Sequence, residues 1–428
     1  MAECRREVKN GIKEIVKTNI NDLPNDVLEH ILSYLPTREV VQTYVLSQMW
    51  RYIWKSVPTI KITESIEDCH NILDPHVILH RGDISIHTCQ LHFVDYFSHQ
   101  KRKANSWIFY ALLVCNVKEL NICVSFDDDN LKMANQTIIS KHLRKLVLDT
   151  IELKTNFVDF TSCPLLEDLE MSYCIITGNK IISNSLKHLR MEDMVFRTYE
   201  VDDLAVQILI CVPNLVSLSL FGFDGWTPLF ESMPSLVSAT VVCNDECSDA
   251  CMYSKFWDCG NEDCRGCYAR SDHKYGCLLL DRLSSTTHME LINDYRMVPD
   301  NYNIANIFYR DLRWSPLFRN LKTLVLNEWF LDNGLWGLLC IVKCSPSLEK
   351  ITLKLYTDPE QMVDNKESYD TMVQPFVTKQ LKKIKVKCEK EMEWVKNIVI
   401  TLTKFGIPQQ IICVEEVSSS SRTLGLHN

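Results

Sequence analysis

Glycine is scarce in this chain, at 12 of 428 residues, and the common catalytic motifs are missing. There is no glycine-rich phosphate loop, no dinucleotide-binding fingerprint, no Gly-x-Ser-x-Gly elbow and no His-Glu-x-x-His pair. Catalytic triads can be assembled from residues far apart in sequence, so these absences disfavour an enzyme without excluding one.

Long apolar runs and long basic runs are also absent. The longest uncharged apolar stretch, residues 107–117, is about half of the ~20 residues that a membrane-spanning helix needs. Residues 1–22 are charged at nearly every third position, unlike a secretion signal. The formal net charge of -9 comes from interspersed acidic and basic residues. We therefore expect no membrane and no nucleic-acid partner, and a location in the cytoplasm, the nucleus or both.

Apolar residues are concentrated near the N-terminus, where residues 23–54 predict two or three short helices. Pro24 suits the first turn of a helix, and Pro36 is expected to end it. Thr37 is a candidate cap for a second helix and Ser47 for a third. The first helix has an apolar stripe made of Val27, Leu28, Ile31, Leu32 and Leu35.

These helices carry more apolar side chains than so short a segment can bury alone. About 32 residues lie below the ~40 at which a domain usually folds without disulfides, metal or association. The remaining apolar faces must therefore pack either on the rest of the chain or on another protein. Periodicity leaves both possibilities open.

Residues 23–54 closely resemble the F-box of plant F-box proteins, from Leu23-Pro24-x-Asp26-Val27-Leu28 to Trp50-x-x-Ile53-Trp54. The resemblance implies a three-helix module that docks on a Skp-type adaptor, which joins it to cullin and RING subunits. One departure is that Gln48 and Met49 stand where the family usually has basic residues, and the lost charge is expected to weaken docking. The residues at the motif's adaptor-binding or module-stabilising positions are Leu23, Pro24, Val27, Leu28, Ile31, Leu32, Val41, Val45, Leu46 and Trp50.

The pattern apolar-x-x-apolar-x-apolar recurs nine times from about residue 115 onward. Neighbouring copies are mostly about 20 to 35 residues apart, with one longer gap after residue 236, as in leucine-rich repeats. Each copy predicts a short strand that buries its apolar residues by stacking on the next copy. The alternative is an ordinary α/β domain with chance matches. The copies begin at residues 117, 143, 166, 186, 215, 236, 321, 348 and 381.

The side chains between the inward apolar ones should line a concave surface that binds an extended partner. The candidate positions show mixed chemistry, and no basic cluster suited to phosphate is evident in the sequence. The alternative is that each is merely a solvated side chain on a strand. These positions include Glu170, Arg190, Ser219, Val325 and Lys354.

The order of the motifs resembles the plant F-box/leucine-rich-repeat family, including its C-terminal FBD-type strand-helix-strand extension. The predicted fold class is α/β, with an N-terminal three-helix F-box followed by an irregular leucine-rich-repeat solenoid. Residues 392–405 carry a helical apolar stripe followed by a β-rich stretch, and should cap the solenoid. The predicted divisions are a tail at 1–18, the F-box at 19–60, repeats at 61–360, the cap at 361–415 and a disordered tail at 416–428.

A cysteine-rich insertion occupies residues 243–277, within the long gap of the repeat. Cys264 and Cys267 have zinc-ligand spacing, and Cys259 and Cys277 could complete a tetrahedral site, with Cys247, Cys251 and His273 nearby. A structural zinc, reduced thiols in a flexible insertion, and redox chemistry all remain open, and no cofactor is assigned. The 19 cysteines are expected to be thiols or metal ligands rather than disulfides.

The predicted function is substrate recognition in a multisubunit SCF-type ubiquitin ligase. The F-box would hold the adaptor and the repeats would bind an unidentified protein substrate, without catalysis by the chain itself. The alternative is a leucine-rich-repeat scaffold that binds proteins and does not act through a ubiquitin ligase.

Overall fold

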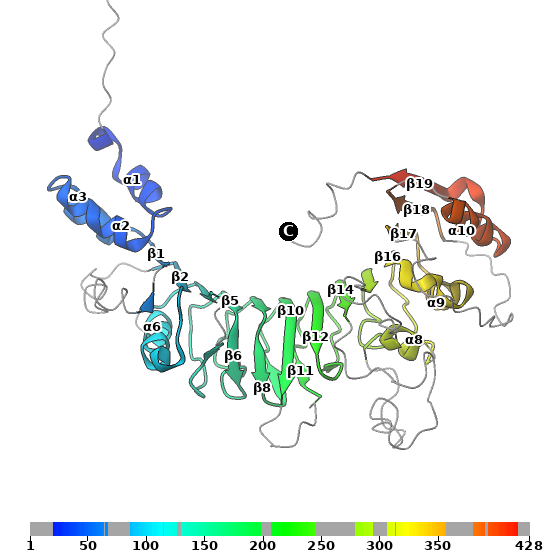
Figure 1. Ribbon diagram of the computed structural model, residues 1–428, viewed down its shortest axis with the longest axis horizontal. Helices are drawn as coiled ribbons and strands as arrows, with labels where there is room; N and C mark the ends of the chain where they lie inside the picture. Colours follow the sequence, from blue (N-terminus) through cyan, green and yellow to red (C-terminus); the bar gives the residue numbers. More distant parts are fainter. Residues whose placement is uncertain are drawn as a thin grey trace, which may run out of the picture.

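The computed structural model is an arc with helices at one end and a long curved sheet (Figure 1). Of the helices that it describes, none is long and apolar enough to span a membrane. The described residues are 20–63, 65–66, 86–113, 115–125, 130–197, 207–244, 279–293, 306–312, 314–356, 380–389 and 393–417.

The N-terminal helices form a lobe, residues 20–56, with a small core of its own. The first helix ends at Leu32, earlier than Pro36 predicts. Thr37 is the first residue of the second helix rather than its cap, and its hydroxyl accepts a hydrogen bond from the Lys61 backbone N–H at 2.7 Å. Met49, not Ser47, precedes the third helix. The elements are η1 (Ile20–Asp22), α1 (Asn25–Leu32), α2 (Thr37–Gln42), η2 (Thr43–Val45) and α3 (Trp50–Ser56).

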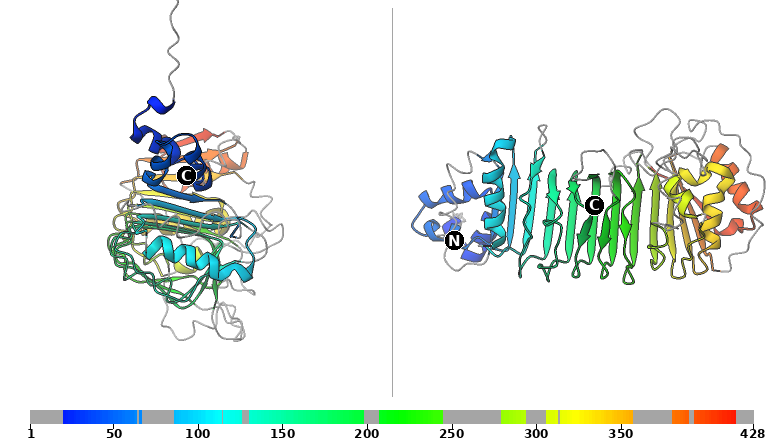
Figure 2. Two further views of the ribbon diagram at one scale, coloured as in Figure 1. Left: turned by 90° about the vertical axis from the view of Figure 1, so that its left-hand side faces the viewer. Right: turned by 90° about the horizontal axis from the view of Figure 1, so that it is seen from below.

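The sheet that follows has 16 strands, is parallel throughout, and places consecutive segments of the chain side by side. Figure 2 shows the strands in a row along the arc. A strand-rich remainder after N-terminal helices is therefore confirmed, and the sheet is open rather than closed. Its main path is β1 (Thr59–Ile62), β2 (Thr88–Phe93), β3 (Glu119–Val124), β5 (Lys145–Asp149), β7 (Asp168–Ser172), β10 (His188–Arg197), β12 (Ser217–Asp224), β14 (Ser238–Cys243), β15 (His288–Asn293), β16 (Thr323–Asn327), β17 (Lys350–Leu355), β18 (Lys383–Cys388) and β19 (Ile412–Glu416).

All nine copies of the sequence pattern lie on strands of this path, each strand beginning two residues after the first apolar residue of the copy. The array nevertheless starts earlier than residue 115. Val57, Ile60 and Ile62 fit the pattern at β1, and Ile86, Cys89 and Leu91 fit it at β2. Both strands pair in register with the rest of the sheet.

The long gap after residue 236 contains a further strand, β15, which the sequence pattern misses. The register pairs His288 with Thr323, so Thr286 stands at the position that Leu321 holds in the next strand. Thr286 is fully buried, and its hydroxyl donates a hydrogen bond to the Leu283 carbonyl at 2.8 Å. A satisfied hydroxyl can replace a leucine there, which hides the repeat from an apolar pattern.

A column of residues with left-handed backbone conformation crosses four neighbouring strands where the chain bends off the inner strand. Thr150, Tyr173, Asp193 and Gly222 have φ of 60°, 51°, 46° and 67° and lie at equivalent register. A Cβ on Gly222 would lie 2.6 Å from Asp193 Oδ1. Glycine is therefore required there by both conformation and space.

Helices and a second sheet cover the outer side of the arc (Figure 1). Residues 107–113 of the longest apolar run lie in α6, whose buried side includes Trp107 and Ile108. The predicted C-terminal helix is confirmed within one residue at each end, and it leads to β19. The remaining helices are η3 (Ser98–Gln100), α6 (Lys101–Leu113), α8 (Asn306–Leu312), η4 (Glu328–Leu331), α9 (Asp332–Lys343), α10 (Glu393–Lys404) and η6 (Gln409–Ile411), and the remaining strands are β4 (Leu131–Lys132), β6 (Ile151–Lys154), β8 (Ile175–Thr177), β9 (Lys180–Ile182), β11 (Leu209–Cys211) and β13 (Leu229–Phe230).

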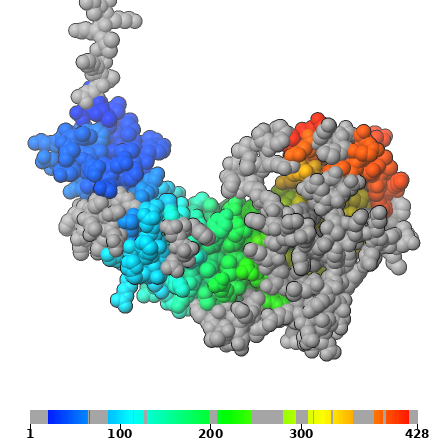
Figure 3. Space-filling model, viewed as in Figure 1, coloured from blue at the N-terminus to red at the C-terminus, as the bar shows by residue number. Residues whose placement is uncertain are grey.

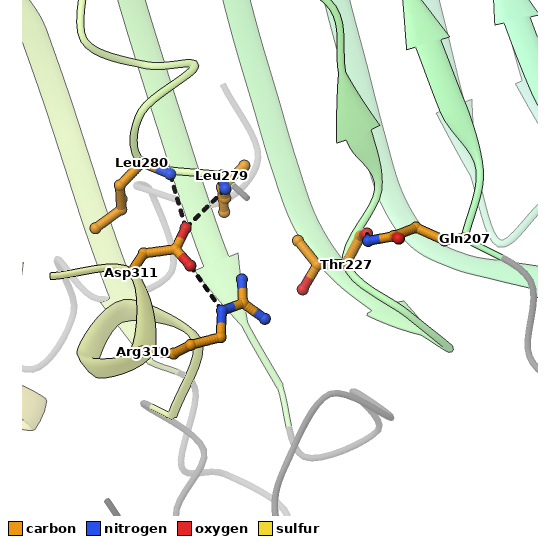
Figure 4. Close-up of polar contacts among 6 residues, drawn as sticks. All are labelled: Gln207, Thr227, Leu279, Leu280, Arg310 and Asp311. Atoms are coloured by element: carbon orange, nitrogen blue, oxygen red, sulfur yellow. Dashed lines mark hydrogen bonds and ion pairs between the residues drawn. The ribbon is translucent and has the colours of Figure 1, made fainter. Parts of the chain in front are cut away.

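Polar anchors fix the chain where it re-enters the described part of the fold after residues 198–206 and 245–278 (Figure 4). Gln207 donates to the Thr227 carbonyl at 2.9 Å. Asp311 is fully buried and accepts hydrogen bonds from the backbone N–H groups of Leu279 (2.7 Å) and Leu280 (2.9 Å) and from Arg310 Nε (2.6 Å). One carboxylate thus holds the start of the segment that leads into β15.

Replacing Asp311 should therefore weaken this half of the sheet. We expect Asp311→Ala to lower the free energy of unfolding by about 3–5 kcal/mol, because it leaves a buried guanidinium and two amide N–H groups without this acceptor. Asp311→Asn should cost about 1–3 kcal/mol, since an amide oxygen still accepts. Urea-induced unfolding measures both, with Asp224→Ala at an exposed strand end as a control that should change stability by less than about 0.5 kcal/mol.

Candidate functional site

The ten residues predicted to hold the N-terminal module together or contact its partner fall into two structural groups. Leu28, Leu32 and Trp50 are buried in the core of the lobe, and Val41 is half-buried between this core and the core of the sheet. The other six are exposed, namely Leu23, Pro24, Val27, Ile31, Val45 and Leu46. The buried group holds the helices together, and the exposed group is available to a partner.

The exposed apolar side chains of the lobe are numerous for so small a unit. Half of the large apolar side chains that are exposed in the described residues lie between Ile20 and Tyr52. Leu23, Val27 and Ile31 are spaced by four residues, which places them on one face of α1 and the turn before it. The complete set is Ile20, Leu23, Val27, Ile31, Tyr34, Tyr44, Val45, Leu46 and Tyr52, which we call the apolar face.

The lobe stands at the end of the arc, away from most of the sheet (Figure 3). Burial of the apolar face against the described body of the chain is therefore not observed, and Val45 stays 68% exposed. Exposed apolar groups concentrated in this way are typical of a protein-binding surface. Of the two possibilities that periodicity left open, the structure favours a partner outside the described residues.

One hydrogen bond ties elements of the lobe together and a second ties the lobe to the sheet. Trp50 Nε1 donates to Asn21 Oδ1 at 2.7 Å and ties the first turn, η1, to α3. Thr37 accepts from the Lys61 backbone, which ties α2 to β1. Val57, directly after α3, belongs to the core of the lobe and also opens the first strand repeat. The apolar face is therefore linked to the sheet by packed structure rather than by a free linker.

Gln48 and Met49 occupy the short segment between η2 and α3. Gln48 is exposed, while Met49 is half-buried and packs against the core of the lobe. A basic side chain at position 49 would replace that apolar contact, whereas one at position 48 would stand in solvent. Position 48 is therefore the place where the missing charge could be restored without disturbing the helices.

The side chains on the inner face of the sheet form rows across the strands. Glu170, Arg190, Ser219 and Val325 lie in one row, and Lys354 lies in the next. Arg190 donates to Glu192 at 2.8 Å and lies over the Phe221 ring, 4.2 Å from its centroid. Lys145 pairs with Glu170 at 2.6 Å, and Lys354 pairs with Glu290. Three of the five predicted positions, Glu170, Arg190 and Lys354, therefore already form ion pairs with neighbouring side chains.

A basic cluster, which the sequence did not reveal, lies on the same inner face at the C-terminal end of the array. It comprises Lys350, Lys354, Lys383, Lys385 and Lys387, on the adjacent strands β17 and β18. No basic cluster is evident in the sequence because the lysines alternate with buried apolar residues and about 30 residues separate the two strands. Only the register brings them together.

The eleven cysteines that the structure describes form no disulfide with one another. Burial is the main cause that raises the pKa of Cys174, Cys123 and Cys340 to about 12. These thiols are protonated at neutral pH and are therefore poor nucleophiles and poor metal ligands. The described residues hold no cluster suited to a metal, and the zinc candidates Cys259, Cys264, Cys267 and Cys277 lie outside them.

Comparison with known proteins agrees with the geometry of the lobe. A family model described as the F-box domain matches residues 20–61. Among the relatives, a putative F-box/FBD/LRR-repeat protein of Arabidopsis thaliana is 27% identical over 54% of this chain and 60% of its own length. An F-box/LRR-repeat protein of the same plant is 27% identical over 46% of this chain and 60% of its own length. The matched part thus spans less than two thirds of these relatives.

The division into buried and exposed residues predicts two different mutant phenotypes. Leu28→Asp should unfold the helical lobe, because a carboxylate at a fully buried position costs about 3–5 kcal/mol or more. Ile31→Asp, one turn away and 41% exposed, should change stability by less than about 1 kcal/mol. Limited proteolysis of the lobe distinguishes them: rapid cleavage of both variants would contradict the assignment of Ile31 to the surface.

Proposed function

The chain belongs to the plant F-box/leucine-rich-repeat family, and from that premise we propose that it is a substrate-recognition subunit of an SCF-type ubiquitin ligase. In this proposal the apolar face of the lobe docks on a Skp-type adaptor, which connects the chain to cullin and RING subunits. The inner face of the sheet binds a protein substrate. The chain would act in the cytoplasm, the nucleus or both.

The observation that carries the proposal is the apolar face itself. An F-box lobe with a closed core of seven buried apolar residues still exposes nine large apolar side chains in 33 residues. Hydrophobic side chains exposed at that density are most stable when a second protein removes them from water. The buried residues Leu28, Leu32 and Trp50 would act indirectly, by holding the exposed ones in place.

We further propose that the sheet is an irregular leucine-rich-repeat solenoid. Parallel strands in chain order, each with inward apolar residues at the same register, support this architecture. We propose the divisions given above, with the F-box at 19–60, repeats at 61–360 and an FBD-like cap at 361–415. The first strand, β1, begins at Thr59, so the F-box and the first repeat share this boundary.

The chain itself would do no bond making or breaking. Holding a substrate and the charged ubiquitin carrier in one complex raises their effective concentration, to the millimolar range for short connections, and this accounts for the rate gain. The packed junction between α3 and β1 suits this role because it keeps the substrate at a defined place relative to the adaptor. A flexible junction would lower the effective concentration.

Charge substitutions on the apolar face provide the first test. We expect Val45→Asp together with Leu46→Asp to weaken binding to a purified plant Skp-type adaptor at least about 30-fold, corresponding to about 2 kcal/mol. Both side chains are more than 60% exposed, so folding should be unaffected. Leu113→Asp with Trp314→Asp, at apolar positions on the body that are 58% and 61% exposed, is the matched control. Equal binding by all three proteins, or no binding by any, would contradict the proposal.

A second candidate function, a scaffold outside any ligase, is favoured by Gln48 and Met49. Gln48→Arg separates the two, since it restores a basic residue at an exposed position without displacing Met49. A ligase subunit should bind the adaptor already and gain a few-fold in affinity, because a charge at the rim of an interface contributes modestly. Isothermal titration measures this. A native chain that binds only after the substitution would favour the scaffold.

A further inference from the structure

The five lysines of β17 and β18 form a patch of one sign on the inner face of the sheet, which we call the lysine patch. Lys350 lies directly opposite Lys383, and Lys354 lies directly opposite Lys387. Lys385 lies between the two pairs, opposite Thr352. Figure 1 places these strands on the inner side of the arc, with α9 and α10 on the outer side. The lysines therefore face the space that the arc encloses.

Like charges directly opposite on neighbouring strands destabilise a sheet. Two such pairs occur side by side here, although any residue that fits a pleated surface could occupy these positions. Carboxylates partly offset two of the lysines: Lys354 pairs with Glu290 on β15, and Lys385 pairs with Glu415 on β19 at 2.7 Å. Within the described part of the chain, Lys350, Lys383 and Lys387 have no carboxylate within 4 Å. Glu415 also lies directly opposite Lys387, and the charges of Lys383 and Lys387 add to its bond with Lys385 in lowering its pKa. Five lysines against the two carboxylates Glu290 and Glu415 still leave an excess of positive charge on this part of the face.

The inner face next to the patch is different in character. Strands β12, β14 and β16 present mostly small or uncharged side chains there, among them Ser217, Ser219, Thr240 and Val325. From β3 to β10 carboxylates outnumber basic side chains on this face, although Glu170 pairs with Lys145 and Glu192 pairs with Arg190. The carboxylates are Glu119, Asp149, Asp168, Glu170 and Glu192. The charge of the inner face therefore changes sign along the arc. An extended partner with charge at one end would bind in one direction along this face.

We propose that the lysine patch binds an acidic segment of a protein substrate, held in extended form along the inner face. This inference rests on the proposed substrate-binding role of the sheet and adds the chemical class of what is bound. The patch extends about 13 Å along the strands, from Lys350 to Lys354, and about 5 Å from β17 to β18. A partner that runs along the arc crosses these strands, so acidic residues at one end of it would meet the patch, while the neighbouring small side chains let its backbone approach.

Protein fits this surface better than nucleic acid does. Single-stranded nucleic acid is usually held by aromatic side chains that stack on its bases, and the inner-face residues of β16 to β19 include no aromatic side chain. The carboxylates on the same face, toward β3 and β7, would repel a continuing phosphate backbone. A segment with acidic residues at one end only avoids this repulsion.

The test uses the full chain, with and without the adaptor, and a fluorescent peptide of alternating Glu and Ser, with an alternating Lys and Ser peptide as the opposite-charge control. We expect the Glu peptide alone to bind, with an affinity that falls as salt is raised. Lys383→Gln with Lys387→Gln should weaken binding at least about tenfold. Arg102→Gln with Lys103→Gln, on the outer helix α6, removes the same charge and should leave binding unchanged. Equal losses in both variants would overturn the proposal, because they would reflect net charge alone.

Stability separates a binding role from a structural one. Neutralising two lysines of a like-charge ladder should leave the midpoint of urea unfolding unchanged or raise it, while peptide affinity falls. A lower midpoint with unchanged affinity would mean that the lysines stabilise the fold, and would overturn the proposal. Equally tight binding of single-stranded DNA, with the same dependence on Lys383 and Lys387, would assign the patch to another class of partner.

Two further results would overturn either the acidic-segment inference or the proposed ligase role. Residues 357–379, which join β17 to β18, carry five carboxylates and two lysines. If the chain binds the Glu peptide only after these carboxylates are changed to amides, the patch serves the chain's own segment and the proposal fails. Adaptor binding is scored separately: its loss with peptide binding retained would overturn the ligase role alone, and the reverse result would overturn only the acidic-segment inference.

Discussion

The parallel strand ladder is the constraint on which the rest of this structure depends. A strand in such an array finds its ladder hydrogen-bond partners in the strands beside it, and its buried side chains pack on those strands and on the helices of the outer side, so each strand depends on its neighbours. Each end strand of the array has a neighbouring strand on one side only, so other parts of the chain must cover its apolar residues. At one end the first strand grows directly out of the helical lobe through Val57, and at the other α10 packs beside β18 and β19.

This constraint explains what could be predicted from the sequence. Apolar residues that face the core recur at the same spacing in most strands, so this spacing predicted nine of them from the sequence. The C-terminal helix was predicted from its own apolar stripe. Strand β15 was missed because Thr286 satisfies its hydroxyl locally and fills a leucine position. Strands β1 and β2 follow the same pattern but were missed. The copy at β1 begins directly after the helices, and the copy at β2 has Cys89 in place of a leucine. Helix starts were off by one or two residues: Pro24 precedes the first helix instead of lying in its first turn, and Pro36 and Met49, rather than Thr37 and Ser47, precede the second and third.

The candidate site was predictable only in part, for a related reason. The resemblance to the F-box assigned ten residues to motif positions, and the periodicity gave no means of dividing them into buried and exposed, since Leu28 and Ile31 belong to the same stripe. A stripe of that width exceeds what a small core can cover, and only the packed helices show that Leu28 is enclosed while Ile31 is not. The lysine patch depends on register between segments about 30 residues apart, which no local pattern contains.

The apolar face and the lysine patch each depart from what stability alone would favour. Exposed Val45 and Leu46 are costly in water, and facing Lys350 and Lys383 repel one another across a strand pair. A fold in which local preferences otherwise agree concentrates such departures where it serves function. Both sites lie at the ends of the array, one before the first strands and one on β17 and β18. An extended partner held at the lysine patch would therefore follow the inner face toward the lobe. The strand ladder would then fix the distance between this partner and a protein docked on the apolar face.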